Sequence, residues 1–126
     1  MVGIVIVSHS EMLAEGVLDA TRIMADGCPV ATAGGNDCGG YGTSYEKIRN
    51  AIEKVHSADG TVVLVDMGSA VMTAEMAIED LGYGDVCLLD CPIAEGAIAA
   101  SLSSLCGDDL ETVKKQALSA KAEAKW

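Results

Sequence analysis

The sequence predicts an α/β fold in which β-α units repeat around a parallel sheet. Short aliphatic runs, typical of strands buried on both faces, alternate with segments whose apolar residues recur at helical spacing. A length of 126 residues is near the commonest size of one domain, so we expect a single domain over residues 1–126. Half of the residues are hydrophobic but only 3% are aromatic, which predicts a tightly packed aliphatic core.

The first β-α unit begins close to the N-terminus. We predict a buried strand over Ile4–Val7 and a helix over Met12–Met24, which Gly27 and Pro29 bring to an end. The apolar face expected for this helix consists of Leu13, Val17, Ala20 and Met24.

The second unit contains a glycine-rich connection. A short strand is predicted over Val30–Ala33, and a loop over residues 34–42 follows it. Thr43 and Ser44 offer a cap for the next helix. The apolar face expected for that helix consists of Ile48, Ala51, Ile52 and Val55.

Two further strands and three helices complete the expected fold. The third strand is predicted over Thr61–Val65, and a helix follows it to about Leu81. A fourth strand is predicted over Val86–Leu89, followed by helices over Glu95–Leu105 and Leu110–Ala122. The small residues that follow Glu95 suit close packing in the core or, alternatively, against a second subunit.

Polar and glycine-rich segments follow the first three predicted strands. They are residues 8–10 (Ser-His-Ser), residues 42–44 (Gly-Thr-Ser) and residues 66–69 (Asp-Met-Gly-Ser). Because ligands of open parallel sheets bind beyond the carboxyl ends of the strands, we expect all three segments at one edge of the molecule.

His9 is the leading catalytic candidate because a neutral imidazole nitrogen at this edge is a good nucleophile. Asp66, on a strand expected to neighbour the first, could accept the hydrogen of one ring nitrogen and leave the other with its lone pair outward. The carboxylate would also stabilise the cationic ring that forms on attack at phosphorus. The alternatives are that His9 only caps a helix or fills the strand end, and that Asp66 is a helix cap or an ordinary loop acid.

A phosphoryl group could be held beside His9 by neutral donors. Gly42 permits close backbone approach, and Thr43 lies at a helix start where backbone N–H groups are free. Ser69 could add a hydroxyl, although it could also simply cap the next helix. The two standard nucleotide-binding glycine fingerprints are absent, and a flexible turn is the simpler interpretation of the loop.

Charge and cysteine usage exclude several other classes of function. The formal net charge of −11 and the lack of a basic cluster argue against nucleic acid as a partner. No aliphatic run is long enough to span a membrane and no targeting segment precedes the first strand, so we expect a cytoplasmic protein without a membrane partner. The five cysteines lack metal-site spacing and are expected to be reduced, and we expect no cofactor and no metal.

Five segments, in this order, resemble the phosphotransferase subunit of the phosphoenolpyruvate-dependent dihydroxyacetone kinase. They are GIVIVSHS (residues 3–10), LAEGV (13–17), GTS (42–44), DMGSA (66–70) and EGA (95–97). This family is similar to the mannose-type enzyme IIA domains of the sugar phosphotransferase system. The resemblance implies a three-layer α/β/α open sheet of about four mostly parallel strands, and a homodimer.

The resemblance also implies a phosphotransferase with a phosphohistidine intermediate. His9 would accept a phosphoryl group from the histidine-containing phosphocarrier protein. It would pass this group to ADP on the kinase's nucleotide subunit, and so support phosphorylation of dihydroxyacetone. Asp66 would orient the His9 ring, and Gly42, Thr43 and Ser69 would donate hydrogen bonds to the phosphoryl group.

Three other functions remain open from the residues. A mannose-type enzyme IIA domain of a sugar transporter would use the same His9 with a different acceptor. A receiver-like domain would carry phosphate on Asp66, although the acidic cluster and the lysine that such a site needs are missing. A scaffold or nucleotide-binding module would carry no covalent phosphate.

Overall fold

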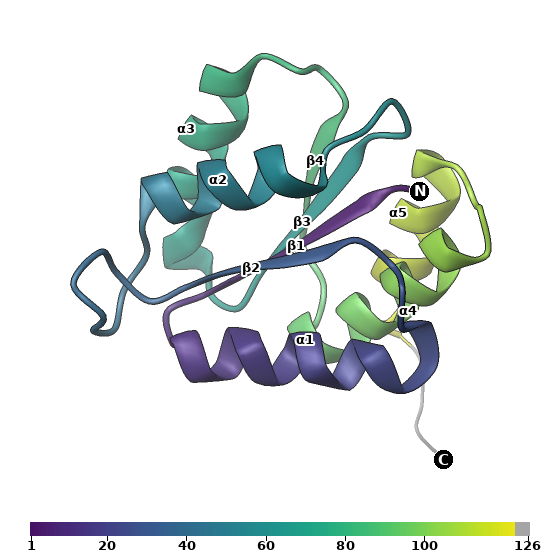
Figure 1. Cartoon of the computed structure of the whole chain (residues 1–126), viewed down its shortest axis with the longest axis horizontal. Coiled ribbons are helices and arrows are strands. Elements are labelled where there is room, and N and C mark those ends of the chain that lie inside the picture. The colour runs from purple at the N-terminus through teal and green to yellow at the C-terminus, as the bar shows by residue number, and fades with distance from the viewer. Residues whose placement is uncertain (123–126) are drawn as a thin grey trace.

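The computed structural model describes residues 1–122 and contains one sheet of four parallel strands in the order β2-β1-β3-β4 (Figure 1). β1 is central and pairs with β2 on one side and β3 on the other, so that Val7 lies opposite both Ala33 and Val65. The strands coincide with the predicted aliphatic runs to within one residue at each end: β1 Gly3–Ser8, β2 Val30–Gly34, β3 Thr61–Val65 and β4 Val86–Leu89.

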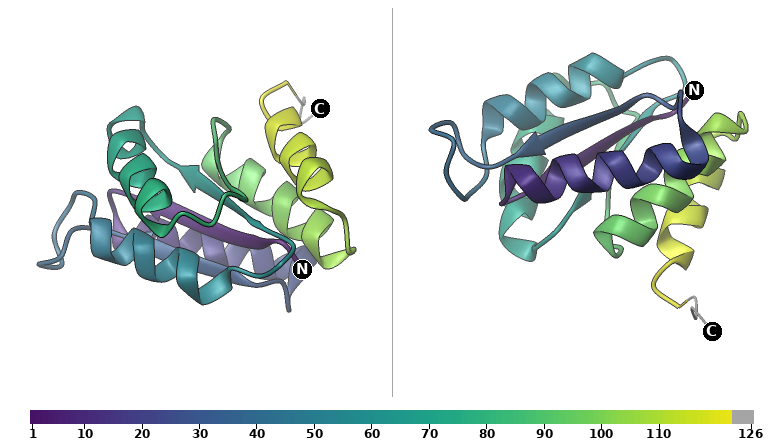
Figure 2. Two further views of the ribbon diagram at one scale, coloured as in Figure 1. Left: turned by 90° about the horizontal axis from the view of Figure 1, so that it is seen from above. Right: turned by 60° about the horizontal axis from the view of Figure 1, so that its bottom comes forward.

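Helices cover both faces of the sheet, which confirms the three-layer α/β/α architecture (Figure 2). One face packs against α1, α4 and α5, and the other against α2 and α3. The bounds are α1 Glu11–Ala25, α2 Tyr45–Val55, α3 Val71–Leu81, α4 Ile93–Leu105 and α5 Leu110–Ser119, with a 3₁₀ turn, η1, over Gly68–Ala70. None of the helices among residues 1–122 is long and apolar enough to cross a bilayer.

The alternation of side chains along β1 builds two separate aliphatic cores. Ile4 and Ile6 belong to the core beneath α1, α4 and α5, whereas Val5 and Val7 belong to the core beneath α2 and α3. All four side chains are fully buried. β1 is therefore fixed from both faces, and so is the chain that leaves its carboxyl end.

The helix faces agree with the sequence in α2 and differ in α1. The predicted apolar face of α2 is buried as expected. In α1, however, Leu13 and Met24 are exposed, and the buried residues are Ala14, Val17, Thr21 and Ala25. The cause is the close approach of α1 to β2, where a Cβ added at Gly34 would lie 2.9 Å from the Cβ of Ala14. Only a small residue fits there, so the larger Leu13 faces outward.

Two helix ends also differ from the predicted ones. α4 begins at Ile93, before the expected Glu95, because its first turn already closes through the bond from Gly96 N–H to the Pro92 carbonyl (2.7 Å). α5 ends at Ser119 and not at Ala122, because the last carbonyls accept from residues only three positions ahead. Residues 123–126 of the predicted domain lie outside the described part of the chain.

Candidate functional site

The candidate site lies at the carboxyl ends of β1 and β3. β1 leads into α1 on one face of the sheet, whereas β3 leads through η1 into α3 on the opposite face. Neighbouring strands whose connections leave on opposite faces form the switch point at which open α/β sheets bind their ligands. His9 directly follows β1, and Asp66 directly follows β3.

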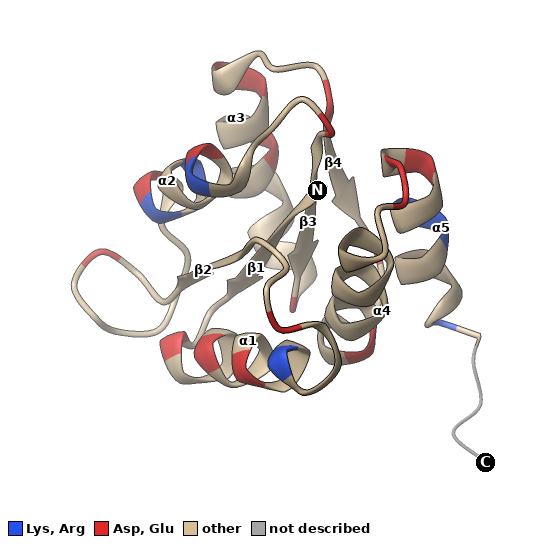
Figure 3. Cartoon of the chain, turned by 45° about the vertical axis from the view of Figure 1, so that its right-hand side comes forward, with Lys and Arg blue, Asp and Glu red and all other residues tan. Residues whose placement is uncertain are grey.

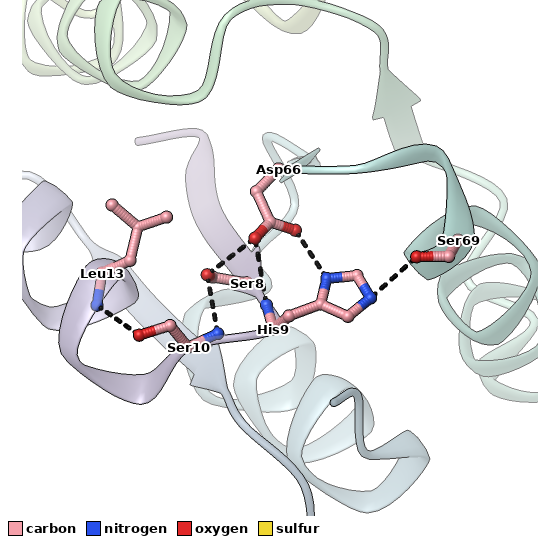
Figure 4. A network of polar contacts seen from close by, with 6 residues as sticks. All are labelled: Ser8, His9, Ser10, Leu13, Asp66 and Ser69. Atoms are coloured by element: carbon pink, nitrogen blue, oxygen red, sulfur yellow. Dashed lines mark hydrogen bonds and ion pairs between the residues drawn. The ribbon is translucent and has the colours of Figure 1, made fainter. Parts of the chain in front are cut away.

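The Asp66 carboxylate contacts both the imidazole ring and the backbone N–H of His9 (Figure 4). Nδ1 of His9 lies 3.0 Å from Oδ1 of Asp66, and the His9 backbone N–H donates to Oδ2 over 3.1 Å. Because an ionised carboxylate only accepts hydrogen bonds, this contact places the ring hydrogen of neutral His9 on Nδ1. Nε2 then keeps its lone pair, as a nucleophile at phosphorus requires.

Asp66 is well suited to remain ionised in this position. Burial alone raises the pKa of its carboxyl group, but hydrogen bonds from the His9 ring, the His9 N–H and the Ser8 hydroxyl outweigh that effect and lower the pKa below its ordinary value. Its side chain is 5% exposed and that of His9 22% exposed. The carboxylate is thus shielded from solvent while the imidazole stays accessible.

Ser69 lies on the other side of the imidazole ring. Its hydroxyl is 2.8 Å from Nε2 of His9 and belongs to η1, the first turn after β3. With the ring hydrogen on Nδ1, the hydroxyl donates to Nε2. The predicted meeting of His9, Asp66 and Ser69 is therefore observed, and both ring nitrogens are engaged.

Gly42 and Thr43, the two other predicted site residues, lie next to His9 through the backbone. The Gly42 N–H donates to the His9 carbonyl over 3.0 Å, and Gly42 has a φ of 138° that favours glycine. This N–H is therefore already in use in the unmodified protein. The Thr43 hydroxyl makes no hydrogen bond within residues 1–122, so it is free to donate; the phosphoryl-binding roles of both residues stay predictions.

The glycine-rich loop is held in place by a residue that sequence reasoning missed. Asn36 Oδ1 accepts from the N–H groups of Cys38 and Gly40, each over 2.9 Å, and its Nδ2 donates to the Tyr41 carbonyl. At the base of the loop, Lys47 Nζ donates to the Gly34 carbonyl over 2.8 Å. An Asn within a glycine run is the available signal for such a turn.

Ser8 belongs to a segment that the sequence placed at this edge, but sequence reasoning gave its side chain no role of its own. Its hydroxyl donates to Oδ2 of Asp66 over 2.9 Å and accepts from the Ser10 N–H over 3.0 Å. The side chain is fully buried at the end of β1. The available signal in the sequence was that a serine ends a run of aliphatic residues.

The other histidine of the described chain, His56, lies away from this site. His56 caps the C-terminal end of α2, and its ring stacks on that of Tyr83 with 4.2 Å between centroids. Its Nδ1 lies 2.9 Å from the Thr61 hydroxyl, and its Nε2 lies 3.1 Å from an Asp85 oxygen. Both nitrogens contact protein groups, which fits a structural role.

The described residues contain no set of three or more His, Cys, Asp or Glu side chains arranged to hold a metal ion. The five thiols are all free. Burial raises the pKa of Cys91 to about 11, so this thiol stays protonated at neutral pH.

Comparison with known families and proteins agrees with this geometry. Residues 3–114 match the EIIA-man family, described as the PTS system fructose IIA component. The chain is 42% identical over 133 residues to the PEP-dependent dihydroxyacetone kinase phosphoryl donor subunit DhaM of Escherichia coli K12, which covers 98% of this chain. It spans only 28% of that relative, so it corresponds to just over a quarter of the E. coli protein.

A second relative is similar to this chain in length. The PTS-dependent dihydroxyacetone kinase phosphotransferase subunit DhaM of Lactococcus lactis is 34% identical over 114 residues, with 90% of this chain and 91% of the relative covered. Among solved structures, the unknown function protein EF1359 superimposes with a TM-score of 0.85 at 26% identity, over 100% of this chain and 99% of that one.

Proposed function

The chain belongs to the EIIA-man family and to the phosphoryl donor subunits of dihydroxyacetone kinase, and from this membership we propose that His9 carries a phosphoryl group on Nε2. The donor is a histidine-containing phosphocarrier protein, and the acceptor is ADP bound to the nucleotide subunit of the kinase. The observation that carries the proposal is the placement of the His9 ring. Asp66 holds Nδ1 from the buried side, while Nε2 points to the accessible side.

The transfer requires two displacements at phosphorus. In the first, the lone pair of His9 Nε2 attacks the donor's phosphohistidine, the new N–P bond forms, and the donor imidazole leaves. In the second, a terminal oxygen of ADP attacks the same phosphorus, the N–P bond breaks, and neutral His9 returns. Throughout, Asp66 keeps the hydrogen on Nδ1 and stabilises the positive charge that develops in the ring.

Ser69 and Thr43 complete the proposed phosphoryl site. The Ser69 hydroxyl, 2.8 Å from Nε2, has to turn away from the lone pair before phosphorylation and can then donate to a phosphoryl oxygen. The unbonded Thr43 hydroxyl offers a second donor, next to the Gly42 backbone that contacts His9. Neutral donors of this kind suit a group that must be passed on, because they stabilise it less than a salt bridge would.

The surface around the site fits protein partners. Four large apolar side chains near His9 are exposed: Met12 at 85%, Tyr41 at 86%, Met67 at 55% and Met72 at 75%. We call these four residues the docking patch. Met12 and Tyr41 line a cavity of about 580 Å³ together with Glu11 and Glu15. A third acidic residue, Asp19, continues this series along α1 (Figure 3). A partner with an apolar surface edged by Lys or Arg matches this arrangement.

Family membership also leads us to propose a cytoplasmic homodimer. Light scattering on the purified protein tests the dimer directly, because a monomeric mass would contradict it. The chain spans 28% of the E. coli relative, so the partners and the compartment of the whole protein are proposals.

The proposed carrier function is tested by intact mass measurement after incubation with phosphoenolpyruvate, enzyme I and the phosphocarrier protein. We expect one phosphoryl adduct that is lost in acid, survives alkali and is absent from His9→Ala. His56→Gln is the matched control, because it removes the other histidine and should leave the adduct in place. Addition of the ADP-loaded kinase subunit should then discharge the adduct and form ATP.

Other outcomes of the same experiment decide against the proposal. An adduct that alkali removes, and that only an Asp66 variant lacks, would favour the receiver-like function. Discharge by a sugar transporter's domain and not by the kinase subunit would favour the mannose-type enzyme IIA alternative. Without any adduct from an active donor, the chain is not a phosphoryl carrier.

A further inference from the structure

We propose that Ser8 is a positioning residue for the phosphoryl transfer: its buried hydroxyl orients the Asp66 carboxylate and thereby keeps the His9 hydrogen on Nδ1. This inference rests on the proposed function of His9 and adds a residue to it. Ser8 touches neither the ring nor the phosphoryl group, so its effect has to pass through Asp66.

The direction of the Ser8 hydroxyl is set by its neighbours. The Ser10 N–H donates to Ser8 Oγ over 3.0 Å, and Asp66 Oδ2 lies 2.9 Å from the same oxygen. A hydroxyl has one hydrogen to give, and an N–H cannot accept it. The hydrogen of Ser8 therefore points at Asp66, and no other orientation satisfies both contacts.

The two oxygens of Asp66 are divided between different donors as a result. Oδ2 accepts from the Ser8 hydroxyl and from the His9 backbone N–H, whereas Oδ1 contacts the ring of His9. Three groups from two consecutive residues thus fix the plane of the carboxylate. Without the Ser8 hydroxyl, the carboxylate can rotate about its Cβ–Cγ bond, and the ring loses its fixed acceptor.

The position of Ser8 makes this arrangement rigid. The residue is the last of β1, pairs with Gly34 of β2 and is fully buried, so no solvent competes for its hydrogen. On its other side the network continues to the start of α1, where the Ser10 side chain accepts from the Leu13 N–H over 3.2 Å (Figure 4). The Ser8 hydroxyl therefore links the end of β1 and the start of α1 to the pair formed by His9 and Asp66.

A buried serine that only satisfies its own hydrogen-bonding needs would behave differently from a positioning residue. Its removal would lower stability and leave the protonation of His9 unchanged. A positioning residue also changes which ring nitrogen carries the hydrogen and at what pH Asp66 is protonated. Both properties can be measured without reference to stability.

The experiment compares Ser8→Ala with Ser8→Thr and with Ser101→Ala. Ser101 is a matched control: it is fully buried, and its hydroxyl donates to the Ile98 carbonyl within α4, away from the site. Nitrogen-15 NMR of the imidazole, at a pH where His9 is neutral, reports the tautomer without any phosphoryl donor. We expect hydrogen on Nδ1 in the wild type, Ser8→Thr and Ser101→Ala, and a mixture of tautomers in Ser8→Ala.

The kinetic readout is the pH profile of His9 phosphorylation. In Ser8→Ala we expect a rate about tenfold lower at neutral pH, the usual effect of one hydrogen bond to a charged group. We also expect the acid limb of this profile to move to higher pH, because Asp66 loses a donor to its ionised form and its pKa rises. Ser8→Thr keeps a hydroxyl, so both the rate and the position of the acid limb should stay close to those of the wild type.

An unchanged tautomer and an unchanged pH profile in a folded Ser8→Ala protein would overturn the inference. That result leaves the proposed function intact as long as the wild type is phosphorylated and His9→Ala is not. Conversely, the tautomer measurement holds even if the wild type accepts no phosphoryl group, so the two proposals fail separately.

Discussion

The hydroxyl of Ser69 lies 2.8 Å from Nε2 of His9, on the side of the ring opposite Asp66. The nitrogen proposed to attack phosphorus is thus hydrogen-bonded in the unmodified protein, and the bond must break before the attack. The same hydroxyl is then within reach of the phosphoryl group that takes its place. In the proposed transfer, Ser69 would therefore oppose the start of the reaction slightly and support its transition state.

Removal of the Ser69 hydroxyl should slow the transfer. A hydrogen bond to the charged phosphoryl group is stronger than the neutral bond to Nε2, so the loss in the transition state outweighs the gain in the resting protein. For Ser69→Ala we expect His9 phosphorylation to slow by about 10- to 100-fold, as measured by rapid quench at saturating donor. Ser69→Thr keeps a hydroxyl and should stay close to the wild type; an undiminished rate in Ser69→Ala would remove Ser69 from the site.

Replacement of Asp66 by Asn should reverse the protonation of His9. The Ser8 hydroxyl and the His9 N–H both donate to Oδ2, so the amide oxygen will take that position and the NH₂ group will face Nδ1. Nδ1 must then accept, and the ring hydrogen moves to Nε2, where it blocks attack. We expect phosphorylation to fall by about 100-fold or more. Asp90→Asn, a change at an exposed carboxylate, is the control.

Asp66 should also make stability depend on pH. The folded protein lowers the pKa of this carboxyl below the ordinary 3.8, so in this range the unfolded chain binds more protons than the folded one. The resulting stabilisation is complete above the ordinary pKa and is lost as the pH falls through the folded one. Urea unfolding at neutral pH and at about pH 3 should show a larger loss in the wild type than in Asp66→Asn. Equal losses would mean that the pKa of Asp66 is not lowered.

The sequence was sufficient to predict the sheet because every strand is a short, mostly apolar run, and the two central strands, β1 and β3, are buried on both faces. It also placed His9, Asp66 and Ser69 at one edge, since the carboxyl ends of parallel strands must lie together. The buried face of α1 was predicted wrongly because Leu13 is more hydrophobic than Ala14. The deciding factor was the space between α1 and β2, which only a small side chain fits.

The contacts that organise the site could not be predicted in the same way. The hydroxyl of Ser8 acts on Asp66 58 positions further along the chain. This contact forms only if β1 and β3 pair in the observed register. A pattern of hydrophobic residues predicts that the strands are buried, but not which side-chain atoms meet at their ends. In the unmodified protein the Gly42 N–H donates to the His9 carbonyl, a bond that depends on the final path of the loop and that no sequence pattern indicates. The expected role of Gly42 at a phosphoryl group stays a prediction.

The docking patch should affect binding of the donor more than the chemical step. In Met12→Ala with Tyr41→Ala we expect the KM for the phosphocarrier protein to rise by about tenfold or more, while kcat changes little, because both side chains lie outside the reacting groups. Ile23→Ala is the matched control, since Ile23 is 83% exposed at the far end of the same helix. A rise in salt should also lower kcat/KM, given the acidic surface. Similar kinetics for the double variant and the control would exclude the patch as the donor's contact.

Replacement by alanine should change stability in opposite directions at Gly34, which packs against α1, and at Gly16, which lies within α1. At Gly34 a Cβ would lie 2.6 Å from the Cα of Glu11, which forces α1 away from β2 at the start of the helix that follows His9. At Gly16, inside α1 and exposed, a Cβ would meet nothing within 4 Å. We expect Gly34→Ala to lower the free energy of unfolding by about 1–3 kcal/mol and Gly16→Ala to raise it by about 0.5–1 kcal/mol. Urea unfolding of both variants measures the difference. If Gly34→Ala is as stable as the wild type, then close contact between α1 and β2 does not hold this helix in place beside the site.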